Sequence, residues 1–256
     1  LAAFRGILIA TSNTGASSAL DRVRESVLEM VHGLRTGGHG DVCAVRQLLR
    51  DTLRMATELN LYDAHFRPSL LSSSQTFYAD EGRKNLNSLA DNDIVPFLHH
   101  VRRRIDECYS FSFSHTEALP DSKDLPKETV LGGPFLDAPT GRALVDAVQT
   151  HALGPHVTPL IDAGLSRLLE RDDVDEIGRL YRLLLPLPPA AKKKLLEAFG
   201  NHVAAATLRA LQPGDRTKPN DNTQNLPPID RRTGAARIDA VLRLHDSARR
   251  VARASF

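Results

Sequence analysis

Apolar residues recur every three or four positions along most of the chain, which is the spacing that places side chains on one face of an α-helix. The first such stripe begins at Leu20 and ends at Gly33 and the glycine-rich run of residues 35–40. A second stripe follows Asp41, a residue type that caps helix N-termini. Its apolar members are Val45, Leu48, Leu49, Leu53, Ala56 and Leu59. Two helices joined by a turn are therefore predicted.

Two more helices are predicted before residue 110. Pro68 fits the first turn of one helix, whose apolar face carries Leu70, Leu71, Phe77 and Tyr78. Asp93 is positioned to cap the other. The apolar stripe of this second helix consists of Ile94, Phe97, Leu98, Val101, Ile105 and Cys108. The arginines at residues 102–104 are predicted to face mostly away from this stripe, toward solvent.

The second half of the chain alternates between loop and helix patterns. Residues 110–140 are rich in proline and lack a sustained period, so we predict a loop rather than core. Helical spacing resumes at residues 143–148, 161–169, 177–184 and 195–203. Residues 212–234 are rich in proline, asparagine and aspartate, which predicts a mobile loop.

A last helix is predicted from about residue 235. Its inward residues are expected to be Ile238, Val241, Leu242, His245 and Ala248. Its outward residues are expected to be Arg243, Arg249 and Arg250. A weak internal echo also pairs Leu70 with Leu195 and Leu59 with Leu184, which indicates two copies of a multi-helix unit. Stacked units of this kind form a long rod that separates its two ends.

Composition supports an all-α fold. Hydrophobic residues make up 41% of the chain, charged residues 25% and aromatic residues only 5%, and tryptophan is absent. An aliphatic core is therefore expected, and β-branched residues rarely cluster, which favours helix over sheet. The formal net charge is +2, too small to indicate nucleic-acid or membrane binding through bulk charge. No apolar run approaches the length of a membrane span, so we expect an intracellular protein.

The chemical motifs in the sequence do not indicate a catalytic centre, a metal site or a cofactor. Cys43 and Cys108 lack CxxC spacing, and His32, His39 and Cys43 are separated by a glycine loop without a fourth ligand nearby. The run GGHGD before the second helix lacks the glycine pattern of a phosphate-binding loop. A turn is the simpler interpretation.

Several segments in succession resemble cullins. Residues 48–82, LLRDTLRMATELNLYDAHFRPSLLSSSQTFYADEG, are similar to the second cullin repeat, with its LGLY-like turn, F-x-x-x-L-L pattern and FY-x-x-E. Residues 91–107, DNDIVPFLHHVRRRIDE, resemble the family's D-V-P-x-Y-L-x-H-V-x-x-R-L-x-E. Residues 136–153 and 164–188 resemble later family segments in the same order. The FYADEG and HVRRR forms are similar to type-4 cullins.

The resemblance implies an elongated stalk of cullin repeats. Residues 1–18 would be the end of a first repeat with a polar loop, residues 19–140 the second repeat, and residues 141–256 the third. Such a chain would be a non-catalytic scaffold of a cullin-RING ubiquitin ligase, found in cytoplasm and nucleus. The implied partners are a β-propeller adaptor of the damaged-DNA-binding type and a RING subunit. No membrane, small-molecule ligand or direct nucleic-acid contact is implied.

In the family, the adaptor binds mainly to the first repeat, so the residues implied for adaptor binding are Leu1, Phe4, Arg5 and Leu8. Two other hypotheses remain open. The chain could be a helical-rod subunit of a vesicle-tethering complex, which would predict membrane or small-GTPase partners. Alternatively, Arg243, Arg249 and Arg250 could bind nucleic acid, with an affinity that falls as salt rises.

Overall fold

The computed structural model describes residues 18–38, 40–89, 93–113 and 133–211. It also describes Arg5, Leu242, His245, Asp246, residues 248–250, Ala252 and Arg253. The chain divides into two compact units. Unit 1 comprises residues 1–88 and 99–156, and unit 2 comprises residues 89–98 and 157–256. The regular elements of the described residues are all helical, without a strand, as the sequence predicted.

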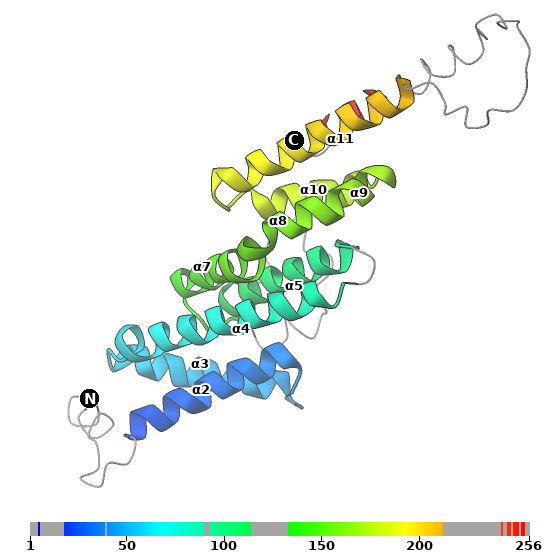
Figure 1. The fold of residues 1–256 in the computed structure, drawn as a ribbon. Coiled ribbons are helices and arrows are strands. Elements are labelled where there is room, and N and C mark those ends of the chain that lie inside the picture. Colours follow the sequence, from blue (N-terminus) through cyan, green and yellow to red (C-terminus); the bar gives the residue numbers. More distant parts are fainter. Residues whose placement is uncertain are drawn as a thin grey trace, which may run out of the picture. The chain divides into compact units, whose positions relative to one another are not determined.

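Unit 1 is built from two helices that pack side by side and a long helix that contacts several others. The side-by-side pair is α2 (Ala19–Thr36) and α3 (Val42–Glu58), shown in blue in Figure 1. The π-helical turn η1 (Tyr62–Phe66) leads directly into the long helix α4 (Arg67–Asn87). Helix α4 packs against α2, against α7 (Ala138–Ala147) and against the π-helical segment η4 (Val148–Leu153). The 3-10 turn η5 (Gly154–His156) ends this unit.

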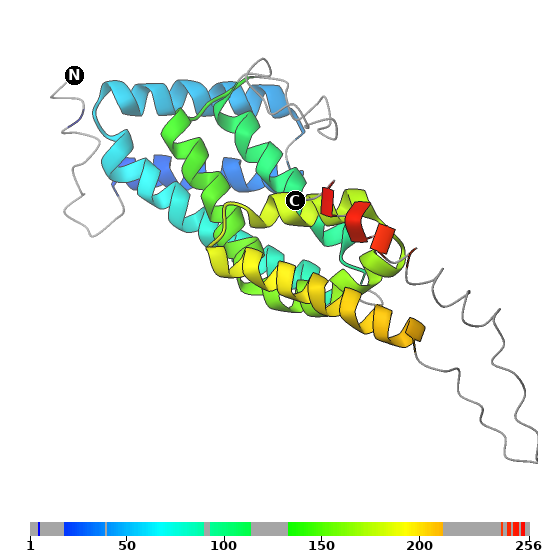
Figure 2. The ribbon, with the colours of Figure 1, turned by 90° about the horizontal axis from the view of Figure 1, so that it is seen from above.

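Helix α5 (Val95–Ser112) contributes its first residues to unit 2 and the remainder to unit 1. The rest of unit 2 begins with α8 (Val157–Pro159), the π-helical segment η6 (Leu160–Leu165) and α9 (Ser166–Glu170). It continues with α10 (Val174–Leu184) and the long helix α11 (Pro189–Leu211), drawn in yellow to orange in Figures 1 and 2.

Polar residues before the first turns explain where several helices begin. The Ser18 hydroxyl accepts a hydrogen bond from the Asp21 amide, and the Asp21 carboxylate accepts one from the Ser18 amide, each 3.1 Å long. This reciprocal pair starts α2. The Asp41 carboxylate accepts from the Ala44 amide at 3.0 Å, and the Asp93 carboxylate accepts from the Val95 amide at 3.2 Å. The sequence-predicted caps of α3 and α5 are therefore confirmed.

The predicted end of α2 was right for the glycine-rich run of residues 35–40 and wrong for Gly33. It lies inside the helix and is buried, and the helix continues to Thr36. Gly37 ends it, with a φ of 73° that a residue without a Cβ adopts at little cost. The extra turn has a structural consequence, because it brings Arg35 into contact with α4 and α5.

The predicted apolar stripes are largely confirmed as core, with two exceptions in unit 1. All six residues of the α5 stripe are buried. Leu48 of α3, predicted to face inward, is 55% exposed. Conversely, Phe135 and Leu136 lie in the segment predicted as loop but are buried, and both of their amides donate to the Phe111 carbonyl. The sequence prediction was wrong here because an isolated pair of apolar residues has no period to detect.

Residues 143–148 and 161–169 were predicted as separate helices. Instead, every residue from Ala138 to Glu170 is helical, in alternating α, π and 3-10 forms. Pro155 and Pro159 fall within this run, at or beside changes of helix type. The changes of hydrogen-bond pattern allow the chain to pass two prolines, which cannot donate a backbone hydrogen bond.

The last predicted helix is only partly described. Leu242 and His245 are helical but exposed, so the prediction that they face inward was wrong for both. Arg249 and Arg250 are exposed, as predicted. Ile238, Val241, Arg243 and the predicted loop at residues 212–234 lie outside the described residues. No helix among the described residues has the length and apolar character needed to cross a membrane.

Two glycines allow close approach between packed elements, one in each unit. A Cβ built on Gly82 of α4 would lie 2.6 Å from the Ala152 carbonyl oxygen of η4. A Cβ built on Gly164 of η6 would lie 2.3 Å from Ile94 Cγ2. Any larger side chain at Gly82 would meet backbone, which cannot move aside as a side-chain tip can. The separation of α4 from η4 therefore depends on this glycine.

Candidate functional site: a charged groove in unit 1

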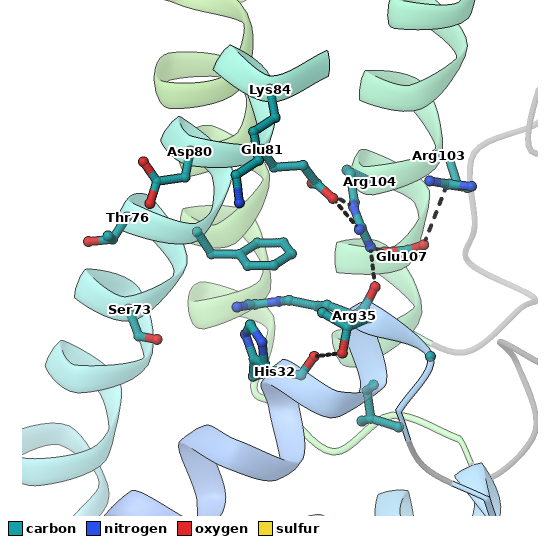
Figure 3. Close-up of a pocket in the computed structure, with 14 residues that line it drawn as sticks. His32, Arg35, Ser73, Thr76, Asp80, Glu81, Lys84, Arg103, Arg104 and Glu107 are labelled. Carbon is teal, nitrogen blue, oxygen red and sulfur yellow. Dashed lines mark hydrogen bonds and ion pairs between the residues drawn. The ribbon is translucent and has the colours of Figure 1, made fainter. Parts of the chain in front are cut away.

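A groove opens in unit 1 between the end of α2, one side of α4 and the second half of α5, with a volume of about 1040 Å³. Figure 3 shows that charged side chains from all three helices meet there. We call it the charged groove. Its lining residues are His32, Leu34, Arg35, Thr36, Gly37, Ser73, Thr76, Phe77, Asp80, Glu81, Lys84, Arg103, Arg104 and Glu107.

Arg104 is the centre of the polar network beside the groove. Its Nε donates to Glu81 Oε2 at 2.8 Å, and its Nη2 donates to the other oxygen of the same carboxylate. Its Nη1 donates to Glu107 Oε2 at 2.5 Å and to the Arg35 carbonyl at 2.9 Å. One guanidinium thus joins the C-terminal turn of α2 to α4 and α5 (Figure 3).

The sequence prediction that residues 102–104 face mostly away from the core was wrong for Arg104, which is only 5% exposed. Arg104 follows Val101 by three positions and precedes Cys108 by four, so it lies on the buried face of α5. The helical spacing of Arg104 from Val101 and Cys108 therefore already indicated that Arg104 lies on the buried face. A charged residue was assigned to solvent because nothing in the sequence identified Glu81 as its partner.

Glu81 is held in its ionised form by the groups around it. Burial by itself would raise the pKa of this carboxyl group. Hydrogen bonds from His100 and Arg104, together with the positive charge of Arg104, outweigh burial and lower the pKa to about 2. His100 Nε2 lies 3.1 Å from Glu81 Oε2, and His100 Nδ1 lies 3.0 Å from a guanidinium nitrogen of Arg103. At neutral pH this carboxylate is a poor proton acceptor, which favours packing and binding over acid–base catalysis.

The lowered pKa predicts how stability changes in acid. Because the folded pKa of Glu81 is below its usual value of 4.5, its stabilising effect is complete above that pH and disappears as the pH falls toward 2. At neutral pH, Glu81→Gln should therefore lower the free energy of unfolding by about 2 kcal/mol, and the difference from wild type should shrink below about pH 5 and close near pH 2. Urea denaturation followed by circular dichroism at several pH values measures this difference.

Asp80→Asn is the matched control, because Asp80 is an exposed neighbouring carboxylate on the same helix. Its difference from wild type should be small at every pH. A Glu81→Gln difference that stayed constant from pH 7 to 3 would contradict the proposed ionic role of Glu81.

Phe77 forms an aromatic wall of the charged groove. The guanidinium carbons of Arg35 and Arg104 each lie 5.4 Å from the centre of its ring. The His32 ring meets Phe77 edge-on at 5.5 Å. Stacking of this kind lets a guanidinium lie in an apolar setting, because the ring face is electron-rich and the cation is weakly hydrated.

Two further polar clusters in unit 1 hold elements together. Tyr62 Oη lies 2.7 Å from Asp137 Oδ1 and 2.9 Å from Thr140 Oγ1, and Arg67 Nη2 donates to Asp137 Oδ2 at 2.8 Å. Burial raises the pKa of Tyr62, so this phenol stays neutral. The cluster connects η1 and α4 to the start of α7. Its geometry fits a structural link, since no group in it is poised to release a proton at neutral pH.

The second cluster surrounds Arg46 of α3, which is 1% exposed. Its Nη1 donates to the carbonyls of Ser110 and Gly133, and its Nη2 donates to the Ser110 hydroxyl at 2.9 Å. The guanidinium also stacks on Phe111 and Phe135, with its carbon 5.3 and 5.8 Å from the ring centres. Burial lowers the pKa of Arg46 to about 10, so it remains charged at neutral pH. It ties the 133–137 segment to α3 and α5.

Of the residues singled out in the sequence, His32, Arg103 and Arg104 line the charged groove, whereas the residues implied for adaptor binding are not among its lining residues. Arg5 is helical and exposed, whereas Leu1, Phe4 and Leu8 lie outside the described residues. Of the rejected metal cluster, His32 and Cys43 are exposed and His39 lies outside that range. No group of three or more His, Cys, Asp or Glu side chains within the described ranges is arranged to hold a metal ion.

Comparisons with known proteins identify the family. A family model for the Cullin alpha solenoid domain matches residues 1–256. Mouse Cullin-4A is 28% identical over 138 residues, which are 54% of this chain and 15% of that protein. Human Cullin-4A is 25% identical over 159 residues, or 62% of this chain and 17% of that protein. Cullin-4 of Dictyostelium discoideum is 19% identical over 206 residues, or 80% and 22%.

These matches cover less than a quarter of each relative's length, and all three relatives are type-4 cullins. The matched family domain is an α-solenoid, and the described residues form helices throughout their regular elements, so sequence and structure agree on the fold. The chain therefore belongs to the cullin family, and it resembles the N-terminal repeat region of the type-4 members.

Proposed function

We propose that this chain is a non-catalytic scaffold within a cullin-RING ubiquitin ligase, and that it separates the substrate adaptor from the RING subunit and the ubiquitin-conjugating enzyme. The observation that carries the proposal is the match of the Cullin alpha solenoid domain to residues 1–256, together with the type-4 relatives. The protein itself performs no bond chemistry in this role. It works in the cytoplasm and nucleus by setting distances.

A spacer of this kind needs stiffness, because it raises the rate of a reaction by holding two reactants at a defined separation. Several features within unit 1 support stiffness. Arg104 joins three helices through charge-assisted hydrogen bonds, Arg46 fixes the 133–137 segment, and Gly82 lets α4 pack directly on the backbone of η4. Each contact opposes bending between neighbouring helices, since it would have to break for the helices to separate.

The proposed partners are a β-propeller adaptor of the damaged-DNA-binding type and a RING subunit. We propose that Leu1, Phe4, Arg5 and Leu8 contribute to the adaptor surface. RING recruitment would use parts of a longer cullin chain that lie beyond the region matched here.

Affinity purification of the tagged full-length cullin from its own cells tests this function. A β-propeller adaptor and a RING subunit should co-purify, and the triple variant Leu1→Asp, Phe4→Asp, Leu8→Asp should lose the adaptor while keeping the RING subunit. A matched variant on an exposed helix, Arg249→Glu, should keep both. Recovery of vesicle-tethering subunits in place of these partners would overturn the proposal.

A further inference from the structure

Arg35, at the wall of the charged groove, is a buried cation without an ion-pair partner among the described residues. The residue is only 6% exposed, and its one side-chain hydrogen bond runs from Nη2 to the Ser74 hydroxyl at 2.7 Å. Its Nε is buried without a partner. No ion pair joins it to any carboxylate in the part of the chain that the structure describes. The guanidinium stacks on the Phe77 and Tyr78 rings, but a ring face carries no net charge, so an anion beside this buried cation would still be favourable.

The residues packed against Arg35 do not provide that anion. Tyr78 and Cys108 are its buried titratable neighbours, and burial raises the pKa of both, that of Cys108 to about 11. Both are therefore neutral at pH 7. The acids that line the groove are already paired, because Arg104 binds Glu81 and Glu107, and Arg83 lies 3.2 Å from Asp80. Among the described residues, no acid of the groove is therefore paired with this guanidinium.

Two further cations line the groove beside Arg35. Lys84 is exposed on the α4 side, and its side chain makes no ion pair or hydrogen bond within the described residues. Arg103 on α5 is half-exposed, and its nearest carboxylate oxygen, on Glu107, is 3.8 Å away. Arg35, Lys84 and Arg103 all line the groove, and Figure 3 shows Arg103 beside Glu107 at its far edge. Three cations from three helices therefore border one opening.

The ionised Glu81 and Glu107 discriminate between possible anions. A phosphate concentrates up to two negative charges in one compact group, so both charges would lie close to Glu81 and Glu107. An acidic peptide spreads its charges along its length, so one carboxylate can pair with Arg35 while the next lies beside Lys84 at the rim. A groove of about 1040 Å³ is also far larger than one ion requires, and instead suits several residues of a peptide. Charge and size together favour an acidic segment of a protein.

We propose that the charged groove docks an acidic segment of a partner protein, and that a glutamate or aspartate carboxylate of this segment pairs with Arg35. Lys84 and Arg103 attract neighbouring acidic residues at the rim. The partner is additional to the adaptor and the RING subunit, and the inference does not depend on the ligase function. It rests on the unpaired charge of Arg35 and on the groove beside it.

Fluorescence anisotropy with labelled hexapeptides and the whole chain tests the proposal. Hexaglutamate should bind at least about tenfold more tightly than hexaglutamine, and inorganic phosphate at millimolar concentration should compete poorly. Arg35→Gln should weaken hexaglutamate binding about tenfold or more, because it removes a buried charged donor. Lys84→Gln should weaken it roughly two- to fivefold, as expected for an exposed cation.

Arg54→Gln is the matched control, because it removes one positive charge from unit 1 at an exposed position of α3 outside the groove. It should leave hexaglutamate binding unchanged at 0.15 M salt. If Arg35→Gln does not fold, as judged by circular dichroism, Lys84→Gln and Arg103→Gln decide the test in its place.

Three outcomes would overturn the inference. Equal binding of hexaglutamate and hexaglutamine would show that the carboxylate is not recognised. Stronger competition by phosphate than by unlabelled hexaglutamate would make the groove a phosphate site. An equal loss of affinity in Arg54→Gln and Lys84→Gln would reduce the effect to the net charge of the chain.

Discussion

Arg104→Ala should lower the free energy of unfolding by about 3–5 kcal/mol, the largest effect that we expect from any single change. The variant leaves Glu81 and Glu107 ionised and only 18% and 16% exposed, without the cation that compensates both. It also leaves the Arg35 carbonyl without its donor. Urea denaturation followed by circular dichroism at 222 nm, at pH 7, measures the loss.

Arg103→Ala is the control for this measurement. Arg103 neighbours Arg104 in the sequence, but its side chain is 50% exposed and its distance to the Glu107 carboxylate is 3.8 Å. Its removal should change the free energy of unfolding by less than about 0.5 kcal/mol. Comparable losses in the two variants would mean that the network around Arg104 does not stabilise the fold in the way described.

Gly82→Ala should be the second most damaging change, with an expected loss of about 2–4 kcal/mol in the free energy of unfolding. Its Cβ would lie 2.6 Å from the Ala152 carbonyl oxygen and 2.9 Å from the Ala152 Cα. Both are backbone atoms, so α4 and η4 would have to move apart along their packed length. The same denaturation experiment measures the effect.

Gly200→Ala, the same chemical change at another position, should raise the free energy of unfolding instead of lowering it. Gly200 lies in α11, and a Cβ built there would meet nothing within 4 Å. Alanine should therefore stabilise the helix by about 0.5–1 kcal/mol, because it restricts the unfolded chain and favours helix. A stabilising Gly82→Ala, or a destabilising Gly200→Ala, would contradict the close packing that we describe.

The internal echo in the sequence illustrates what a hydrophobic pattern can and cannot predict. Leu59 and Leu184 are both buried, and so are Leu70 and Leu195. The same register pairs Met55 with Leu180, yet Met55 is 41% exposed whereas Leu180 is fully buried. A repeat pattern therefore predicts which helices correspond. The neighbours of each copy decide which of the corresponding side chains are covered.

The charged groove shows the same limit for polar residues. Arg35, Arg46 and Arg104 are all buried, and none of them was predicted to be. Each is surrounded by residues distant in the sequence, such as Glu81 for Arg104 and Gly133 for Arg46. Sequence spacing locates a helix face. Sequence spacing cannot show that an acid, a carbonyl or an aromatic ring from a distant segment contacts that face.

The sequence by itself determined the helical class, most helix starts and the cullin family. The Asp41 cap and the α5 stripe depend on residues that are close together in the sequence. Both can therefore be recognised from the sequence alone. Tertiary structure alone decided that Arg35 turns inward, that Gly82 touches Ala152, and that a groove opens between α2, α4 and α5. Those outcomes depend on which surfaces meet, because burial and pairing are properties of contacts between distant segments.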